Sequence, residues 1–236
     1  MNDRRYFYFP IGLPFFLILV FLFLLIYPLF ILLFAGGIVE AFQRLGFNAV
    51  SGTLVFLLAL VGSAINIPIK KINSETPLVE EKVVYFCGVP CVIPSTREQS
   101  TILSINVGGA LIPVLISIYE FIRLFALGAG GTALSSLVGI AIVAIVVHFF
   151  AKPVKGVGIA VPFFIPPIVT IIVALLITRQ YHPAVAYISG TIGTLIGADL
   201  LNLKKIPDLG APVVSIGGAG TFDGVFLTGI LSVLLI

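Results

Sequence analysis

Two aspartates, Asp199 and Asp223, lie in apolar, glycine-rich sequence near the end of the chain. The sequence on either side of each is typical of a membrane span. An ionisable side chain inside a span costs about 2.5–3.5 kcal/mol even on lenient insertion scales. Residues kept at such a cost are the first candidates for function, so this pair is the candidate catalytic site.

Two carboxylates that share one site cannot both ionise easily, and their protonation states separate. One stays charged and acts as general base for a water molecule, while the other keeps its proton and donates to a carbonyl oxygen. The pair therefore predicts an intramembrane aspartyl hydrolase, peptidase-like, acting on a peptide within or near the bilayer. The sequence does not assign the two roles.

A bound cation is the other way to hold two carboxylates together. Asn66, Asn106 and Asn202 would supply neutral oxygen ligands, and the chain would be a transporter or a cation-binding membrane protein. In a third interpretation the aspartates are structural. Asp199 then caps a loop, Asp223 is the N-cap of a helix beginning at Gly224, and the protein is a membrane scaffold without catalytic activity.

Small residues surround both aspartates. Gly193 and Gly197 precede Asp199, and they would let the sixth span approach the seventh closely. We expect the two carboxylates to face each other across that interface, within reach of one water or one ion. The residues expected to line the site are Asn66, Asn106, Asn202, Gly197, Gly220 and Gly224.

Composition fixes the class of protein that must position this site. The 236 residues are 59% hydrophobic and 10% charged, whereas soluble domains are about 45–50% apolar and about 25% charged. The sequence predicts an all-α, polytopic transmembrane bundle in the cell membrane, with residues 1–236 as one domain and the lipid bilayer as partner. The net charge of +3 is no evidence for nucleic acid, because the basic residues lie between the spans.

Seven apolar stretches approach the roughly 20 residues that a membrane-spanning helix needs. They are residues 9–37, 50–69, 101–127, 132–150, 158–178, 184–203 and 215–236. With a cytoplasmic N-terminus, ten of the 13 Lys and Arg residues fall on the inside. This excess predicts the orientation by the positive-inside rule.

The longest polar stretch, residues 70–100, is then a cytoplasmic loop. β-prone runs on either side of Gly88 predict a small hairpin over the membrane face. The only two cysteines, Cys87 and Cys91, have no histidine nearby. A zinc site usually needs four ligands, so we expect two free thiols, no metal and no other cofactor.

The second and third spans resemble the sixth and seventh. Residues 62–72 and 197–206 both begin with glycine and end in Lys-Lys-Ile, and Ser104-Ile opens the third span as Ser215-Ile opens the seventh. Both pairs run in the same direction across the membrane. The pattern predicts a parallel internal repeat about an axis along the membrane normal.

Two stretches carry a resemblance to a known family. At GADLLNL, residues 197–203, and GGAGTFDGVFLTG, residues 217–229, the sequence resembles an uncharacterised prokaryotic membrane family, domain of unknown function 1614. The resemblance extends over most of the chain. It implies a multi-pass membrane protein and no particular activity.

A weaker resemblance is to the presenilin and signal-peptide-peptidase class of intramembrane aspartyl proteases. Those enzymes also place one aspartate in a sixth span and one in a seventh. Their Tyr-Asp and Gly-x-Gly-Asp motifs are not intact here, because Ala198 precedes Asp199 and Gly220-Thr-Phe precedes Asp223. The resemblance implies a peptide substrate and a catalytic role for both aspartates.

Overall fold

A computed structural model describes residues 13–73, 78–86, 89–97, 100–156, 158–218 and 224–236. The α-helices are α1 (Leu13–Arg44), α2 (Ala49–Gly62), α3 (Ile112–Ala126), α4 (Gly130–Phe150), α5 (Ile165–Ile177), α6 (His182–Thr194) and α7 (Gly224–Leu235). Two π-helices, η1 (Val107–Leu111) and η2 (Leu195–Asp199), and one 3-10 helix, η3 (Leu200–Leu209), adjoin them. The strands are β1 (Asn66–Asn73), β2 (Leu78–Phe86), β3 (Val89–Arg97), β4 (Ser100–Asn106), β5 (Lys152–Val154), β6 (Gly158–Ala160) and β7 (Val213–Ile216).

Four helical segments of the described chain are long and apolar enough to cross a membrane. They are Phe15–Arg44, Val107–Ala126, Gly130–Phe150 and His182–Pro207. The helices α2, α5 and α7 are apolar but shorter, at 14, 13 and 12 residues. At 1.5 Å per residue they reach only about 20 Å, against a hydrocarbon core of about 30 Å. The count of seven spans and the cytoplasmic N-terminus stay predictions.

The all-α expectation is wrong at the ends of several spans, where the chain forms strands. β1 occupies the expected end of the second span, β4 the start of the third, β6 the start of the fifth and β7 the start of the seventh. Periodicity does not distinguish a short buried strand from a helix segment, and β-branched residues favour the strand. Pro68, which lacks the amide hydrogen that a helix needs, lies at a register shift in β1.

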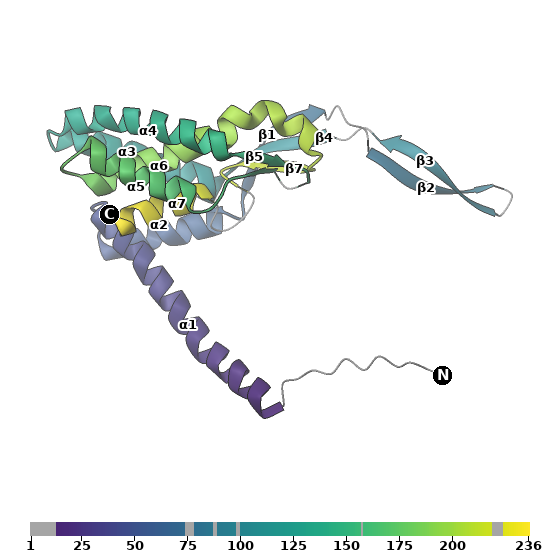
Figure 1. Ribbon diagram of the computed structural model, residues 1–236, viewed down its shortest axis with the longest axis horizontal. Coiled ribbons are helices and arrows are strands. Elements are labelled where there is room, and N and C mark those ends of the chain that lie inside the picture. Colours follow the sequence, from purple (N-terminus) through teal and green to yellow (C-terminus); the bar gives the residue numbers. More distant parts are fainter. Residues whose placement is uncertain (1–12, 74–77, 87–88, 98–99, 157, 219–223) are drawn as a thin grey trace.

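These strands form a three-stranded sheet at one end of the helical bundle, in the order β1-β4-β7 (Figure 1). β1 and β4 are antiparallel, whereas β4 and β7 are parallel. The parallel register places Ser104 opposite Ser215 and Ile105 opposite Ile216. The two segments that the proposed repeat aligns are therefore neighbours in space.

The predicted hairpin in the 70–100 loop is confirmed. β2 and β3 pair antiparallel, with Phe86 opposite Val89. The hairpin extends away from the sheet end of the molecule (Figure 1) and does not fold back over the bundle. Cys87 lies outside the described residues.

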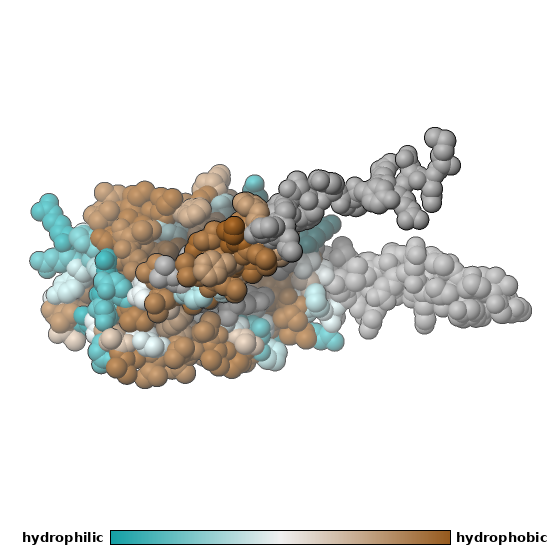
Figure 2. All heavy atoms as spheres, turned by 90° about the horizontal axis from the view of Figure 1, so that it is seen from below, coloured by the Kyte–Doolittle hydropathy of each residue, from teal (hydrophilic) through white to brown (hydrophobic). Residues whose placement is uncertain are grey.

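Helix α6 is the centre of the bundle. It contacts α3, α4, α5 and α7, and ten of its 13 residues are buried. The described side chains of α1 from Phe15 to Tyr27 and from Ile31 to Leu33 are exposed and apolar. Hydrophobic side chains also cover the flank of the bundle seen in Figure 2, while hydrophilic ones gather toward its ends. An apolar flank between polar ends is the surface that a bilayer would cover.

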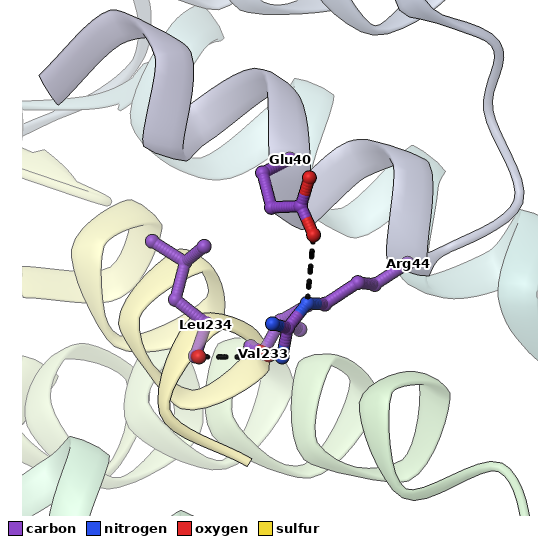
Figure 3. A network of polar contacts seen from close by, with 4 residues as sticks. All are labelled: Glu40, Arg44, Val233 and Leu234. Atoms are coloured by element: carbon purple, nitrogen blue, oxygen red, sulfur yellow. Dashed lines mark hydrogen bonds and ion pairs between the residues drawn. The ribbon is translucent and has the colours of Figure 1, made fainter. Parts of the chain in front are cut away.

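Arg44 ties the end of α1 to the end of α7 (Figure 3). Its Nη1 lies 3.3 Å from the carbonyl oxygens of Val233 and Leu234, and its Nε lies 3.3 Å from Oε1 of Glu40. The last carbonyls of a helix have no partner within the helix, and a cation there also interacts favourably with the helix dipole. Arg44 therefore fixes the C-terminal end of α7, the helix that begins at Gly224.

Candidate functional site

Asp199 is the last residue of the π-helix that continues α6. In a regular α-helix, a residue five positions after Thr194 would lie about 140° around the axis from it. The i→i+5 bonding of a π-helix brings such a residue back toward the same face. Thr194 and Asp199 accordingly line one pocket.

The Asp199 carboxylate is partly buried, and its Oδ2 accepts a hydrogen bond of 2.7 Å from the backbone N–H of Gly217. Asp199 is positioned as the cap of η3, but its side chain makes no capping hydrogen bond. Gly217 and Gly218 both have positive φ, at 81° and 84°. This backbone is accessible to glycine at little cost, and it turns the chain just after β7.

The pocket has a volume of about 450 Å³ and lies where the bundle meets the sheet. Its walls are β7, the segment from Gly158 to Phe163, the α6–η3 region and the start of α7. Most of the lining is apolar, and the polar side chains are those of Thr194, Asp199 and Ser215. Sites for small ligands generally have an apolar lining with a few polar groups.

One edge of β7 faces away from the rest of the sheet. The Ile102 amide of β4 donates to the carbonyl of Pro212, so Pro212 and Val214 direct their backbone groups toward β4. Alternate residues of a strand face opposite edges, which leaves Val213 and Ser215 directed outward. No other strand in the described part of the chain pairs with this edge. Gly217 comes two residues after Ser215, so its N–H also points outward, and this N–H donates to Asp199.

Asn106 and Asn66 lie together on the opposite side of β7 from this edge. Asn106 is fully buried, and its Nδ2 donates to the Ser63 carbonyl at 2.7 Å and to Asn66 Oδ1 at 3.1 Å. Its Oδ1 accepts from the Gly109 amide at 2.7 Å. Asn66 Oδ1 also accepts from the Ser215 hydroxyl, at 2.7 Å. The asparagines reach the pocket only through Ser215, and neither is among the described lining residues.

Asn202 is also fully buried, near His148 at the end of α4. Its Nδ2 donates to the carbonyls of Gly197 and Ala198 at 3.1 and 2.9 Å, and lies 3.2 Å from His148 Nδ1. Its Oδ1 accepts from Lys205 Nζ at 2.7 Å. Asn202 thus satisfies the carbonyls that the end of the α6 segment leaves free, and its hydrogen bonds bring it to the helix end rather than to the pocket.

The glycines before Asp199 pack against α4 and not, as the sequence analysis expected, against α7. A Cβ on Gly193 would meet Val143, and one on Gly197 would meet the carbonyl oxygen of Ala144. The close contact with α7 uses Gly229 instead, which faces Tyr187 and Thr191. Helical spacing alone does not say which neighbour a small residue faces.

Gly224 lines the pocket and is the first residue of α7. The capping hypothesis placed the start of the regular helix at this same residue. Asp223 and Gly220 lie outside the described residues, so the expected pairing of the two carboxylates stays a prediction. In the described part of the chain, no three His, Cys, Asp or Glu side chains come together as a metal site would need.

The sequence analysis missed two polar residues of the pocket, Thr194 and Ser215. Thr194 is 2% exposed, and its Oγ1 has no hydrogen-bond partner. In a regular α-helix, its spacing from Asp199 would place the two residues on different faces. Nothing in the sequence indicated the π-helix that brings them together, so Thr194 could not be identified as a site residue. Ser215 was noted only as part of the repeat.

A family model described as "Protein of unknown function (DUF1614)" matches residues 60–235. The matched region covers the sheet, the pocket and every described element except α1 and most of α2. No curated protein and no solved structure matches the chain, so the resemblance to intramembrane aspartyl proteases gains no support. The chain belongs to the family of proteins of unknown function DUF1614.

Proposed function

We propose that this protein is a multi-pass enzyme of the cell membrane, an aspartyl hydrolase that cleaves an extended peptide segment. The observation that carries the proposal is the position of Asp199 at the outward edge of β7, beside an apolar pocket of about 450 Å³. The bilayer surrounds the apolar flank, and the sheet end lies on the cytoplasmic side.

The free edge of β7 supports a peptide as the substrate. An extended peptide can add to an exposed strand edge through main-chain hydrogen bonds, while pockets accept its side chains. Val213 and Ser215 present that edge, and Ile159, Val161 and Val225 provide apolar lining. A peptide bound there would run along β7 toward Asp199, so that one of its carbonyl carbons lies beside the carboxylate.

Asp223 is the second member of the proposed pair, because it directly precedes Gly224 in the pocket lining. One carboxylate takes a proton from water, and the water oxygen attacks the peptide carbonyl carbon. The other carboxylic acid donates to the carbonyl oxygen. The C–N bond then breaks, and the leaving nitrogen receives a proton.

A cation carrier using the same carboxylate is the second candidate. Its support is the unpartnered Thr194 hydroxyl in the pocket with Asp199, since neutral oxygens and carboxylates are the ligands of hard cations. Thermal unfolding of purified protein with Na⁺, K⁺, Mg²⁺ or Ca²⁺ tests this. Stabilisation by one of these ions, and its loss in Asp199→Asn, would support the carrier.

The hydrolase is tested with purified protein and a library of quenched-fluorescent apolar peptides in detergent. We expect wild-type protein to cleave members of the library, and Asp199→Asn and Asp223→Asn each to lower the rate by about 10³-fold or more. Glu40→Gln is the matched control, because it makes the same change on the exposed surface of α1. Cleavage at the wild-type rate in Asp199→Asn would overturn the proposal.

A further inference from the structure

Three buried hydroxyl groups on α6 have no hydrogen-bond partner, those of Tyr187, Thr191 and Thr194. They are the only buried side-chain nitrogen or oxygen atoms in this condition in the described part of the chain. Their exposed fractions are 0%, 0% and 2%. Leaving a buried hydroxyl unsatisfied costs about 1–3 kcal/mol, and each such group in a native structure calls for an explanation.

The three hydroxyls form a file along one face of α6. Their spacing is i, i+4 and i+7, which places successive members above one another on a helix. The hydroxyls of Tyr187 and Thr191 interact across one turn, although their geometry is not that of a hydrogen bond. On α7, Gly229 faces both residues. Because glycine has no side chain, α6 and α7 approach each other closely beside the file.

At the sheet end, the file meets the candidate site. Thr194 lines the same pocket as Asp199. The file therefore ends beside the pocket that Asp199 lines.

Beyond the opposite end of the file lies Glu120 of α3, a helix that packs against α6. Glu120 and Tyr187 are both fully buried. Glu120 Oε2 accepts from Arg123 Nη1 at 3.0 Å, and Nη1 also donates to the Leu45 carbonyl at 2.7 Å. The Arg123 side chain is 31% exposed. Polar groups thus continue from the pocket, through about 10 Å of α6 between Thr194 and Tyr187, to the far surface.

We propose that Asp199, Thr194, Thr191, Tyr187 and Glu120 form a proton pathway through the bundle. A hydroxyl both donates and accepts a hydrogen bond, so a file of hydroxyls and single waters passes a proton from one carboxylate to the other. Buried chains of ionisable groups in membrane proteins mark such relays. A metal cation needs several oxygens around it at once, whereas these hydroxyls follow one another singly.

The proton balance is simple. A carboxylate at one end takes up a proton from the adjacent solution, and the carboxylic acid at the other end releases one. Each hydroxyl accepts one proton as it passes another on, so no side chain is changed after the transfer. A proton gradient or a membrane potential supplies the driving force. This pathway is independent of peptide cleavage, which needs no gradient.

Proton flux is measured in liposomes that contain the purified protein and a trapped pH-sensitive dye. An outward K⁺ gradient with valinomycin makes the vesicle interior negative, and this potential drives protons inward. We expect protein-containing vesicles to acidify faster than protein-free ones. Tyr187→Phe, Thr191→Val and Thr194→Val should each slow this flux by about tenfold or more, and each should leave the fold intact because the hydroxyl removed has no partner.

Thr170→Val is the matched control. Thr170 is fully buried on α5, but its Oγ1 donates to the Pro166 carbonyl at 2.7 Å, and it lies outside the file. The proton flux into vesicles that contain Thr170→Val should equal that of the wild type. The proposal is overturned if wild-type vesicles acidify no faster than protein-free ones, or if the three hydroxyl variants keep the wild-type rate.

Discussion

Two strand-to-helix junctions lie side by side in this molecule, and they are built differently. β4 leads through Asn106 into η1 and α3, and β7 leads through Gly217 toward α7. The two strands pair in parallel, so Asn106 and Gly217 each follow directly after the paired residues Ile105 and Ile216. At the first junction a buried amide makes three hydrogen bonds. At the second, a carboxylate from another helix binds the backbone beside an open pocket.

The difference separates structural from functional use of a polar side chain. A buried amide that is hydrogen-bonded at both its nitrogen and its oxygen fixes one arrangement of its neighbours. A carboxylate that accepts a hydrogen bond from the backbone and also lines a cavity is oriented and still accessible. The Asn106 junction therefore acts as the rigid template for the sheet, and the Gly217 junction is where the proposed hydrolysis would take place.

Both junctions depend on one close approach, and Gly109→Ala should have the largest effect. A Cβ at position 109 would overlap the carbonyl oxygen of Gly217, so the two junctions would be forced apart. Overpacking of this kind costs about 3 kcal/mol, which we expect as the loss in unfolding free energy in mixed detergent micelles. Gly131→Ala is the control, because a Cβ there meets nothing within 4 Å. Equal stability of the two variants would contradict the packing described.

Asn106→Leu tests the rigid junction alone. The change removes all three hydrogen bonds of the side chain and leaves the Gly109 amide and the Ser63 carbonyl buried without partners. Unsatisfied groups cost about 1–3 kcal/mol each, so two of them at the lower end of this range give an expected loss of about 2 kcal/mol in the same unfolding measurement. Asn66→Leu should cost less, since Asn66 is exposed. A larger loss at Asn66 would reverse the roles assigned to the two asparagines.

Asp199→Asn should have the smallest effect on stability. The amide oxygen still accepts the Gly217 N–H, so the unfolding free energy should change by less than about 1 kcal/mol. The same variant should lose the proposed peptide-hydrolase activity. If it instead destabilises the protein as much as Asn106→Leu does, the second junction is structural like the first, and the comparison fails.

Composition alone predicts the helical, membrane-type bundle, because helix is the simplest way to satisfy the backbone in lipid. It does not predict the sheet, since Val213–Ile216 and Ser100–Asn106 are segments of four and seven residues, too short for their periodicity to distinguish strand from helix. The β2–β3 hairpin could be predicted because polar residues and Gly88 interrupt the apolar pattern.

For the site, the sequence identified Asp199 by the cost of a charge in apolar surroundings, and the structure places it in a pocket. The role of the asparagines could not be predicted, because an amide satisfied by backbone groups and an amide that binds a ligand look alike in sequence. Thr194 was missed because the π-helix changes which residues share a face.

The parallel pairing of β4 with β7 has a consequence for biosynthesis. The Thr101 hydroxyl donates to the Ala211 carbonyl across 110 residues of chain, and the intervening residues include α3, α4, α5 and α6. Proteins are made from the N-terminus, so these helices leave the ribosome before their last partner strand exists. The pocket beside Asp199 is then assembled as a late step, and a chain halted before β7 has neither the Gly217 amide nor the edge on which a peptide would bind.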